Sequence, residues 1–228
     1  TYKEVLEDGI QLLETAAIEE ARLDAWLLLE YTADITRAWY YAHMDDGLDA
    51  KTEERYRTLC TKRAQHIPLQ HITGRAYFMG YEFCVDERVL VPRQDTEVLV
   101  EEAISRMRNL EKPQILDMCT GSGCVLISIL KNVHGTGGYG YDISKQAINV
   151  AKENAKLNDV PAIFERSNLF EDVADETFDV IVSNPPYIRS DEIPFLMPEV
   201  SEFEPREALD GKEDGLFFYR KIIQESPD

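Results

Sequence analysis

From residue 93 onward, short apolar stretches alternate with amphipathic ones, and this alternation constrains the fold more than any other feature of the chain. The amphipathic stretches repeat their apolar residues with helical spacing, as Leu99, Ala103 and Met107 do. The expected elements are a helix at 95–108, a strand, glycine turn and helix within 114–131, a strand that ends at Asp142, a helix at 145–158, strands at 162–168 and 178–184, and a helix at 214–224. Such alternation predicts an α/β fold, a doubly wound parallel sheet with helices on both faces.

The first 68 residues follow a different pattern, which predicts a small helical bundle. Leu6 and Leu13 share one helical face, and Leu23 and Trp26 share another. Residues 69–92 then alternate between apolar and polar around Gly80, as a β-hairpin does. We therefore expect three parts, a helical domain at 1–68, a hairpin linker at 69–92 and the α/β domain at 93–228.

The apolar strand at 178–182 raises the question of what covers the edge of the sheet. A continuous apolar strand is typical of a sheet interior covered on both faces, yet only one more helix follows it. In a doubly wound order it would be left at an exposed edge, which proteins normally avoid. We expect either that the C-terminal strands of the sheet are missing from this chain or that a partner covers the edge.

The charge balance limits the class of partner. The chain carries 43 Asp and Glu against 24 Lys and Arg, a formal net charge of −19. Proteins that bind nucleic acid neutralise phosphates with Lys and Arg, so a small molecule or a protein is a better candidate than extended nucleic-acid binding. The sequence has no apolar run long enough to span a membrane and no signal-peptide pattern. Its 4 cysteines lack CxxC spacing, which favours a cytoplasmic protein with reduced thiols and no metal site.

A glycine turn, Asp117 to Cys124, joins the first strand of the α/β domain to the next helix. Glycines let the backbone pass close to a ligand, and free N–H groups at the helix start face the same crevice. Asp142 ends the following strand, where an acid typically holds ribose hydroxyls. Because the turn lacks the lysine of a phosphate-binding loop, a nucleoside is the better ligand. The alternatives are a tight connection without a ligand and, for Asp142, a helix N-terminal acid beside Ser144.

Two further strand ends carry polar residues. Asn168 and Leu169 follow the third strand, where they could contact an adenine amine and ring or simply form an Asx turn. The fourth strand ends in 184–187, Asn-Pro-Pro-Tyr. The prolines stop strand pairing and hold Asn184 extended, because proline lacks an N–H and fixes φ. This motif is either punctuation or a device that fixes an amide and a carbonyl in space.

Taken together, 117–123, Asp142 and 184–187 resemble the S-adenosylmethionine-dependent methyltransferases that modify planar amide or amine nitrogens. More particularly, LVPRQDTEVLVE at 90–101 resembles the PR-x-DTE-x-LV signature of the release-factor glutamine methyltransferases of the HemK type. EPREALDGKEDGLFFYRKII at 204–223 also resembles a segment of that family. The resemblance covers nearly the whole chain from about residue 65.

This resemblance implies a Rossmann-like methyltransferase sheet, S-adenosyl-L-methionine as cofactor and S-adenosyl-L-homocysteine as product. The implied reaction methylates the side-chain amide of the glutamine in the GGQ loop of a peptide-chain release factor, gripped by the helical domain of a monomeric enzyme. The family usually has an acid where this chain has Asn168. The implied cofactor-binding residues are Asp117, Thr120, Gly121, Ser122, Gly123, Asp142, Ile143, Asn168, Leu169 and Asn184. The implied substrate-binding residues are Arg93, Thr96, Glu97, Asn184, Pro185 and Tyr187. Thr96 could instead cap the helix that starts there.

For the chemistry we predict a clamp of two oxygen acceptors. An amide nitrogen is a poor nucleophile because its lone pair is delocalised, so the enzyme must hold it in line with the methyl group at roughly 3–3.5 Å. The Asn184 side-chain oxygen is expected to accept one N–H and the Pro185 carbonyl the other. Pro186 would stiffen the turn, and Tyr187 would pack against the flat amide; with Asn184 and Pro185 they form the predicted catalytic set.

Three other interpretations stay open from the sequence. The first is methylation of a glutamine of a ribosomal protein. The second is methylation of an adenine amino group in DNA or RNA, which needs a flipped base and a cationic groove that the net charge of −19 disfavours. The third is a module that binds S-adenosylmethionine without catalysis, although 184–187 shows no degraded position.

Overall fold

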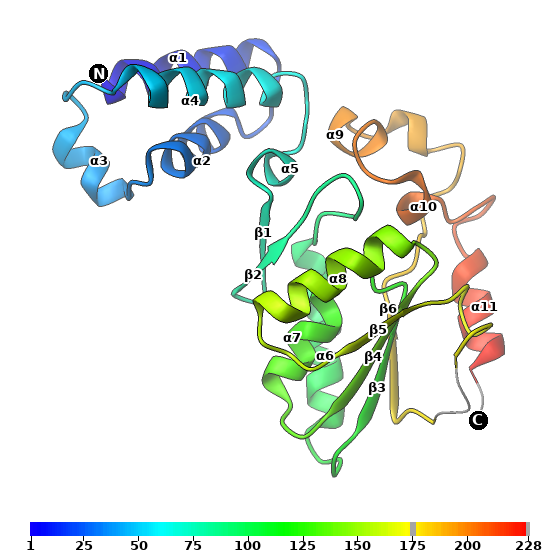
Figure 1. Ribbon diagram of the computed structural model, residues 1–228. Helices are drawn as coiled ribbons and strands as arrows, with labels where there is room; N and C mark the ends of the chain where they lie inside the picture. Colours follow the sequence, from blue (N-terminus) through cyan, green and yellow to red (C-terminus); the bar gives the residue numbers. More distant parts are fainter. Residues whose placement is uncertain (174–176, 227–228) are drawn as a thin grey trace. The chain divides into compact units, whose positions relative to one another are not determined.

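The computed structural model describes residues 1–173 and 177–226. The chain divides into two compact units, Thr1–Thr73 and Gly74–Asp228 (Figure 1). Each unit has its own apolar core. In the described residues, no helix has both the length and the apolar character that a membrane crossing requires.

The first unit is the helical bundle that the sequence predicted. Its core holds the fully buried side chains of Leu13, Leu28 and Leu29. The first helix begins with a capping box, in which the Thr1 side chain accepts from the Glu4 N–H and the Glu4 side chain returns to the cap backbone. The helices are α1 (Tyr2–Thr15), α2 (Ala21–Ala33), α3 (Arg37–His43), α4 (Ala50–Arg63) and α5 (Leu69–Thr73).

The prediction of a buried helical face is wrong for one residue of α2. Leu23 is 42% exposed, whereas Ala25 and Leu28 are fully buried. Apolar residues occupy most positions of α2, so its hydrophobic periodicity does not select one face. Contacts with α1 and α4, which periodicity cannot show, decide which side is covered.

The predicted hairpin is present and belongs to the second unit. Strands β1 (Arg75–Phe78) and β2 (Tyr81–Cys84) pair antiparallel. Met79 and Gly80 connect them with φ values of 51° and 77°, the left-handed pair of a type I′ turn. The Cys84 N–H donates to Oδ1 of the buried Asn154 in α8 (Lys145–Leu157) at 2.6 Å, which fixes the hairpin to the α/β fold.

The sheet of the second unit is parallel throughout, as predicted. Its strands are β3 (Gln114–Met118), β4 (Gly137–Asp142), β5 (Ile163–Arg166) and β6 (Val180–Ser183), in the order β5-β4-β3-β6. In the described chain β6 lies at one end of this order, the edge position expected for the strand before the prolines.

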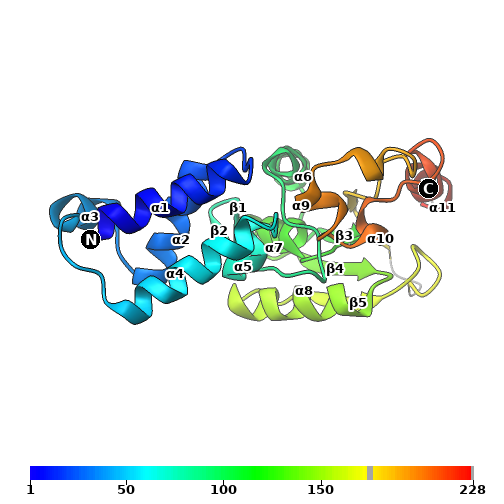
Figure 2. The ribbon, with the colours of Figure 1, turned by 90° about the horizontal axis from the view of Figure 1, so that it is seen from above.

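Helices cover both faces of the sheet, which confirms the doubly wound arrangement (Figures 1 and 2). Alternate residues of a strand point to opposite faces. Ile115 of β3 therefore packs in the core formed with α6 (Glu97–Met107), α7 (Cys124–Asn132) and α8, whereas Leu116 packs toward Phe218 of α11 (Phe217–Glu225). Short helical turns complete the unit: η1 (Gln94–Thr96), η2 (Ile193–Phe195), α9 (Pro198–Ser201) and α10 (Arg206–Leu209).

Candidate active site

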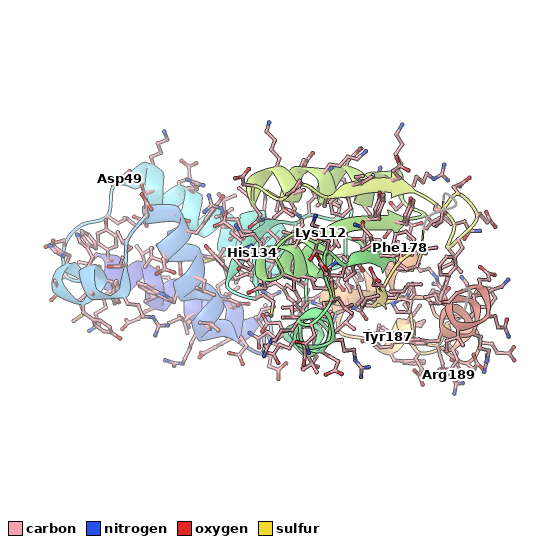
Figure 3. All side chains as sticks on the ribbon, turned by 90° about the horizontal axis from the view of Figure 1, so that it is seen from below. Asp49, Lys112, His134, Phe178, Tyr187 and Arg189 are labelled. Atoms are coloured by element: carbon pink, nitrogen blue, oxygen red, sulfur yellow. The ribbon has the colours of Figure 1, made fainter. Side chains whose placement is uncertain are left out.

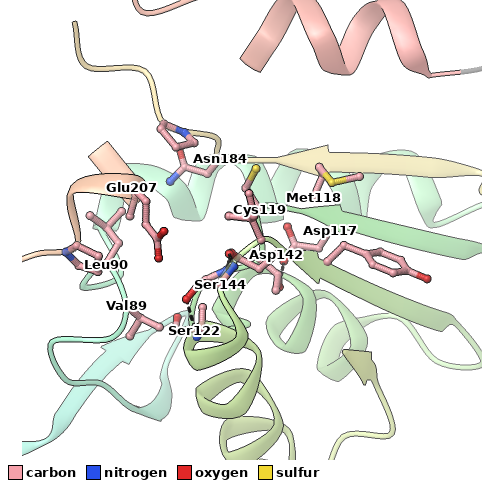
Figure 4. A pocket seen from close by; sticks show the side chains of 18 of the residues that line it. Val89, Leu90, Asp117, Met118, Cys119, Ser122, Asp142, Ser144, Asn184 and Glu207 are labelled. Atoms are coloured by element: carbon pink, nitrogen blue, oxygen red, sulfur yellow. Dashed lines mark hydrogen bonds between the residues drawn. The ribbon is translucent and has the colours of Figure 1, made fainter. Parts of the chain in front are cut away.

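A cavity of about 230 Å³ lies at the carboxyl ends of β3, β4 and β6 (Figure 4). Ligands of parallel α/β sheets bind at this edge, because the loops that follow the strands converge there. The lining residues come from 88–96, 117–125, 141–147, 167–169, 184–186 and 205–218. The cavity therefore collects nearly all the strand ends that the sequence singled out.

The glycine turn after β3 forms the floor of the cavity, and its two glycines serve different purposes. A Cβ on Gly123, where φ is 79°, would lie 3.1 Å from both Ala151 and Phe164, so this residue is required for close packing of helix and strand. A Cβ on Gly121, where φ is 53°, would meet nothing within 4 Å. Gly121 lines the cavity and Gly123 does not. A ligand can thus approach the backbone at Gly121, while Gly123 shapes the turn from behind.

Asp142 is fixed at the end of β4 by two backbone groups. Its carboxylate accepts the N–H of Gly121 and the N–H of Ser144, each at 2.9 Å. The sequence left two roles open for Asp142, an acid at a helix start and an acid in a ligand cavity. The structure places it in both positions. Burial raises its pKa above the usual value, in spite of these bonds. Because a carboxylate has about four acceptor sites, it still has capacity for hydroxyl groups of a ligand.

A second acid, Asp117, lies deeper in the same wall. It is 1% exposed, and its Oδ2 accepts the Thr120 hydroxyl at 2.7 Å. Burial raises the pKa of Asp117 to about 7. Figure 4 shows Glu207 on the side of Leu90 and Asn184, and Asp142 between it and Asp117. Three carboxyl groups around one cavity suit a ligand that carries hydroxyl groups and positive charge.

The end of β5 supplies the predicted third wall. Asn168 and Leu169 both line the cavity, as does Ile143 after β4. The Ser167 hydroxyl donates to the Leu169 carbonyl at 2.6 Å and stabilises Leu169 at a φ of 51°. Nδ2 of Asn168 donates to Oε1 of Glu171 at 2.8 Å. The side chain of Leu169 offers an apolar surface on which a flat ring could pack.

The Asn-Pro-Pro-Tyr segment follows β6 and borders the cavity from the other side. Asn184 and Pro186 line it, and Nδ2 of Asn184 donates to Oγ1 of Thr96 at 3.4 Å. Pro185 is buried, and in the described part of the chain its carbonyl accepts no backbone hydrogen bond. Tyr187 is 56% exposed and lies at the surface of the unit (Figure 3). Neither Pro185 nor Tyr187 belongs to the cavity lining.

Residues of the signature at 93–97 separate into two groups. Arg93 and Thr96 line the cavity. Within the described residues the Thr96 side chain makes no capping hydrogen bond to α6, and its hydroxyl instead accepts from Asn184. Glu97 lies outside the lining, and its carboxylate accepts the N–H of Met79 at 2.6 Å, in the turn of the hairpin. The contacts of Glu97 therefore indicate that this residue holds the turn of the hairpin.

A second segment, 204–215, seats the proline motif. The Ile188 N–H donates to the Leu209 carbonyl at 3.0 Å, and the Gly211 N–H donates back to Ile188 at 2.7 Å. A Cβ on Gly211 would lie 2.6 Å from the Cα of Tyr187, and one on Gly215 would also collide with the Tyr187 backbone. Only glycine permits this close approach, which fixes the path of the chain after the prolines.

This same segment contributes lining residues that the sequence analysis did not assign. Pro205, Glu207 and Ala208 face the cavity, and so does Val89 from the loop after the hairpin. The signal in the sequence is the motif at 204–223, whose resemblance to a methyltransferase segment does not by itself distinguish site residues. Its charged and small residues carry no chemistry that distinguishes them from a surface turn.

Two family models match the chain. The PrmC N-terminal domain matches residues 4–74, and the methyltransferase small domain matches residues 94–197. The first match falls on the helical bundle, and the second contains the glycine turn, Asp142 and the proline motif.

Curated relatives are similar over almost the full length of the chain. The release factor glutamine methyltransferase of Geobacter sulfurreducens is 39% identical over 228 residues, which are 100% of this chain and 80% of the relative. That of Clostridium botulinum is 38% identical over 98% of this chain and 81% of the relative. Among solved structures, the tRNA (uracil-54, C5)-methyltransferase of Pyrococcus abyssi in complex with S-adenosyl-L-homocysteine is 24% identical over 65% of this chain and 36% of that one, with a TM-score of 0.43.

Proposed function

The chain belongs to the release factor glutamine methyltransferases, and on that premise we propose how its site performs the reaction. The enzyme transfers the methyl group of S-adenosyl-L-methionine to the side-chain amide nitrogen of a release factor glutamine and releases S-adenosyl-L-homocysteine. The observation that carries this assignment is the position of Asn184 in the same cavity as Gly121 and Asp142. This shared lining supports a single cavity that takes a nucleoside at its floor and an amide at its rim.

The cofactor fits the wall formed by the glycine turn and the ends of β4 and β5. Asp142 would accept the ribose hydroxyls, and the open backbone at Gly121 leaves room beside it. Leu169 would support the adenine ring, with Asn168 at its edge. The remaining members of this proposed set are Asp117, Thr120, Ser122 and Ile143, with Gly123 as packing support. When bound, the cofactor supplies an activated methyl group on a sulfonium.

The chain's own residues then have to hold a weak nucleophile in place. The glutamine amide has two N–H groups and a delocalised lone pair. Oδ1 of Asn184 accepts one N–H, and the Pro185 carbonyl, to which no backbone N–H of the described residues donates, accepts the other. This pair aligns the nitrogen without a strong base. Pro186 keeps the turn stiff, and the exposed ring of Tyr187 is free to cover the flat amide of an incoming loop. The bound protein substrate would also exclude water from the cavity.

We assign the protein contacts of the substrate to the parts outside the cavity. The helical domain, 1–68, would bind the body of the release factor, the hairpin segment 69–92 would link it to 93–228, and the GGQ loop would enter beside Arg93 and Thr96. The enzyme would work as a monomer in the cytoplasm, where release factors act. Light scattering of the purified chain and hydrogen exchange with and without release factor test the oligomeric state and the surface assigned to 1–68.

A methyl-transfer assay tests the function as a whole. The protein is incubated with cofactor labelled in the methyl group and with release factor, ribosomal subunits or DNA in separate reactions. We expect label only on the release factor, and none when the glutamine of its GGQ loop is replaced. Asn184→Ala serves as the catalytic control. Label on a ribosomal protein or on DNA would replace the assignment with one of the alternative substrates.

A further inference from the structure

Glu204, on the segment that seats the proline motif, is a buried acid to which the proposed mechanism gives no part. Its side chain is only 1% exposed. A buried carboxylate is unfavourable unless a cation and hydrogen-bond donors compensate it. Burial raises the pKa of Glu204, and Arg93 and the Val91 N–H oppose that shift. The position of such a group calls for an explanation other than packing.

The two oxygens of Glu204 hold two different groups of one loop. Oε1 accepts the Val91 N–H at 3.2 Å, and Oε2 accepts the Nη2 group of Arg93 at 2.6 Å. This loop, 88–93, lines one side of the cavity, and residues 205–208 line another. Glu204 therefore connects two walls that are more than a hundred residues apart in the sequence.

Arg93 keeps most of its binding capacity. A guanidinium has five N–H donors, and in the described residues the structure records hydrogen bonding of the Arg93 guanidinium to Glu204 alone. The side chain is 41% exposed and lines the cavity together with Thr96 and Asn184. The remaining donors can thus reach oxygen atoms of a ligand that enters at this rim.

We propose that Glu204 is a positioning residue, which holds the Arg93 guanidinium so that its free N–H groups bind backbone carbonyl oxygens of the substrate loop. The inference rests on the proposed function, because it assumes a protein loop at the Asn184 rim. Backbone carbonyls are better acceptors here than the oxygen of the reacting amide. A guanidinium on that oxygen would draw the lone pair further from the nitrogen that must attack. A planar fork also binds Glu204 and a ligand at once, which a single ammonium does less well.

Glu204→Gln separates the two contacts. Its amide oxygen can still accept the Val91 N–H, but its NH₂ group then faces the donors of Arg93. We expect the KM for release factor to rise about tenfold, roughly the value of one charge-assisted hydrogen bond. The Kd for S-adenosyl-L-methionine, measured by calorimetry, and the melting temperature should stay close to those of the parent. Glu202→Gln, which changes an exposed acid two residues before Glu204, is the matched control and should leave all three unchanged.

A double-mutant cycle tests whether Glu204 acts through Arg93. The KM of the double variant Arg93→Ala with Glu204→Gln should be no higher than that of Arg93→Ala alone. Arg93→Lys, which keeps a positive charge beside Glu204, should raise the KM by a similar factor and covers the case in which Glu204→Gln fails to fold.

Three results would overturn the proposal. The first is an unchanged KM in Glu204→Gln or in Arg93→Lys. The second is additive effects on KM in the double-mutant cycle. The third is weaker cofactor binding with an unchanged KM, which would assign Arg93 to the cofactor carboxylate. A protein that methylates no release factor at all would instead contradict the proposed function. The two failures are therefore distinguishable.

Discussion

The amide nitrogen of Asn184 donates to the hydroxyl of Thr96 at 3.4 Å, across 88 residues of sequence. This contact occupies the NH₂ group of the Asn184 side chain and leaves its oxygen as the group available to a substrate amide. If the amide were turned over, its NH₂ group and not its oxygen would face the N–H groups of the substrate, so we predict that Thr96 helps to orient Asn184.

Thr96→Val should therefore lower the methylation rate without weakening cofactor binding. Valine keeps the shape of the side chain but removes the hydroxyl, so Asn184 loses the contact that orients it. We expect a fall in kcat of about tenfold, or ~1.4 kcal/mol of transition-state stabilisation. Single-turnover transfer of labelled methyl measures it. Thr96→Ser, which keeps the hydroxyl, should stay near the parent rate, and a Thr96→Val enzyme of parental rate would refute the orienting contact.

Asn184→Ala removes the acceptor itself. We expect turnover to fall about 100-fold or more, which is roughly 2.7 kcal/mol, while the Kd for the cofactor changes little. The reason is that the interaction forms with the amide N–H of the substrate in the transition state. Steady-state kinetics and calorimetry on the same preparation check the two quantities. Equal losses of binding and turnover would instead assign Asn184 to the cofactor.

Asp117 should make the stability of the free protein depend on pH. Its pKa is about 7 when folded and 3.8 in its ordinary state. A carboxyl group with a raised pKa binds its proton more tightly in the folded chain, so the free energy of unfolding falls as pH rises between these values and levels off above pH 7.

Asp117→Asn, which stays neutral, should reduce this loss. Urea denaturation at several pH values from 5 to 8 would show a smaller decline for the variant than for the parent. Asp142, whose pKa is also raised, remains and accounts for a residual slope of the same sign. If the free energy of unfolding fell equally with pH in both proteins, the pKa of the Asp117 carboxyl would not be raised in the folded state.

The two glycines of the turn after β3 should differ in how much stability they lose on substitution by alanine. Gly123→Ala places a Cβ against Ala151 and Phe164 at a positive φ, so we expect a loss of about 1–3 kcal/mol in the free energy of unfolding. Gly121→Ala meets open space at its positive φ, so it should cost about 1 kcal/mol of stability.

Cofactor binding distinguishes the pair further. The new methyl group of Gly121→Ala enters the cavity, so its Kd for S-adenosyl-L-methionine should rise about tenfold or more. Thermal melts with and without cofactor measure both quantities. The assignment fails if Gly123→Ala is the variant that loses affinity while keeping its stability.

The sequence predicted the sheet well for a physical reason. Each strand is a short apolar run, and turn residues such as Pro113, Gly121 and Pro185 mark its ends. Parallel strands place their carboxyl ends together, so the residues after each run meet in one cavity. The lining of the cavity at these strand ends could therefore be predicted strand by strand.

The opposite side of the cavity depends on contacts that no local pattern reveals. The pairing of Ile188 with Leu209 and Gly211 brings 204–208 to the cavity, and Glu204 then reaches Arg93. In the sequence these residues read as a polar surface turn. The prediction for Leu23 was wrong for a similar reason. The packing of neighbouring helices, and not periodicity, selects the buried side of α2.

The two glycines that press against the backbone of Tyr187 also limit how this chemistry could be moved elsewhere. If residues 184–187 were grafted after a strand of another protein, the side chains would be present. The backbone surface against which the segment packs here would be missing. A working transplant would have to carry the distant glycine segment too, in the spacing that lets it lie against the graft. Selection acting on either stretch therefore acts on both.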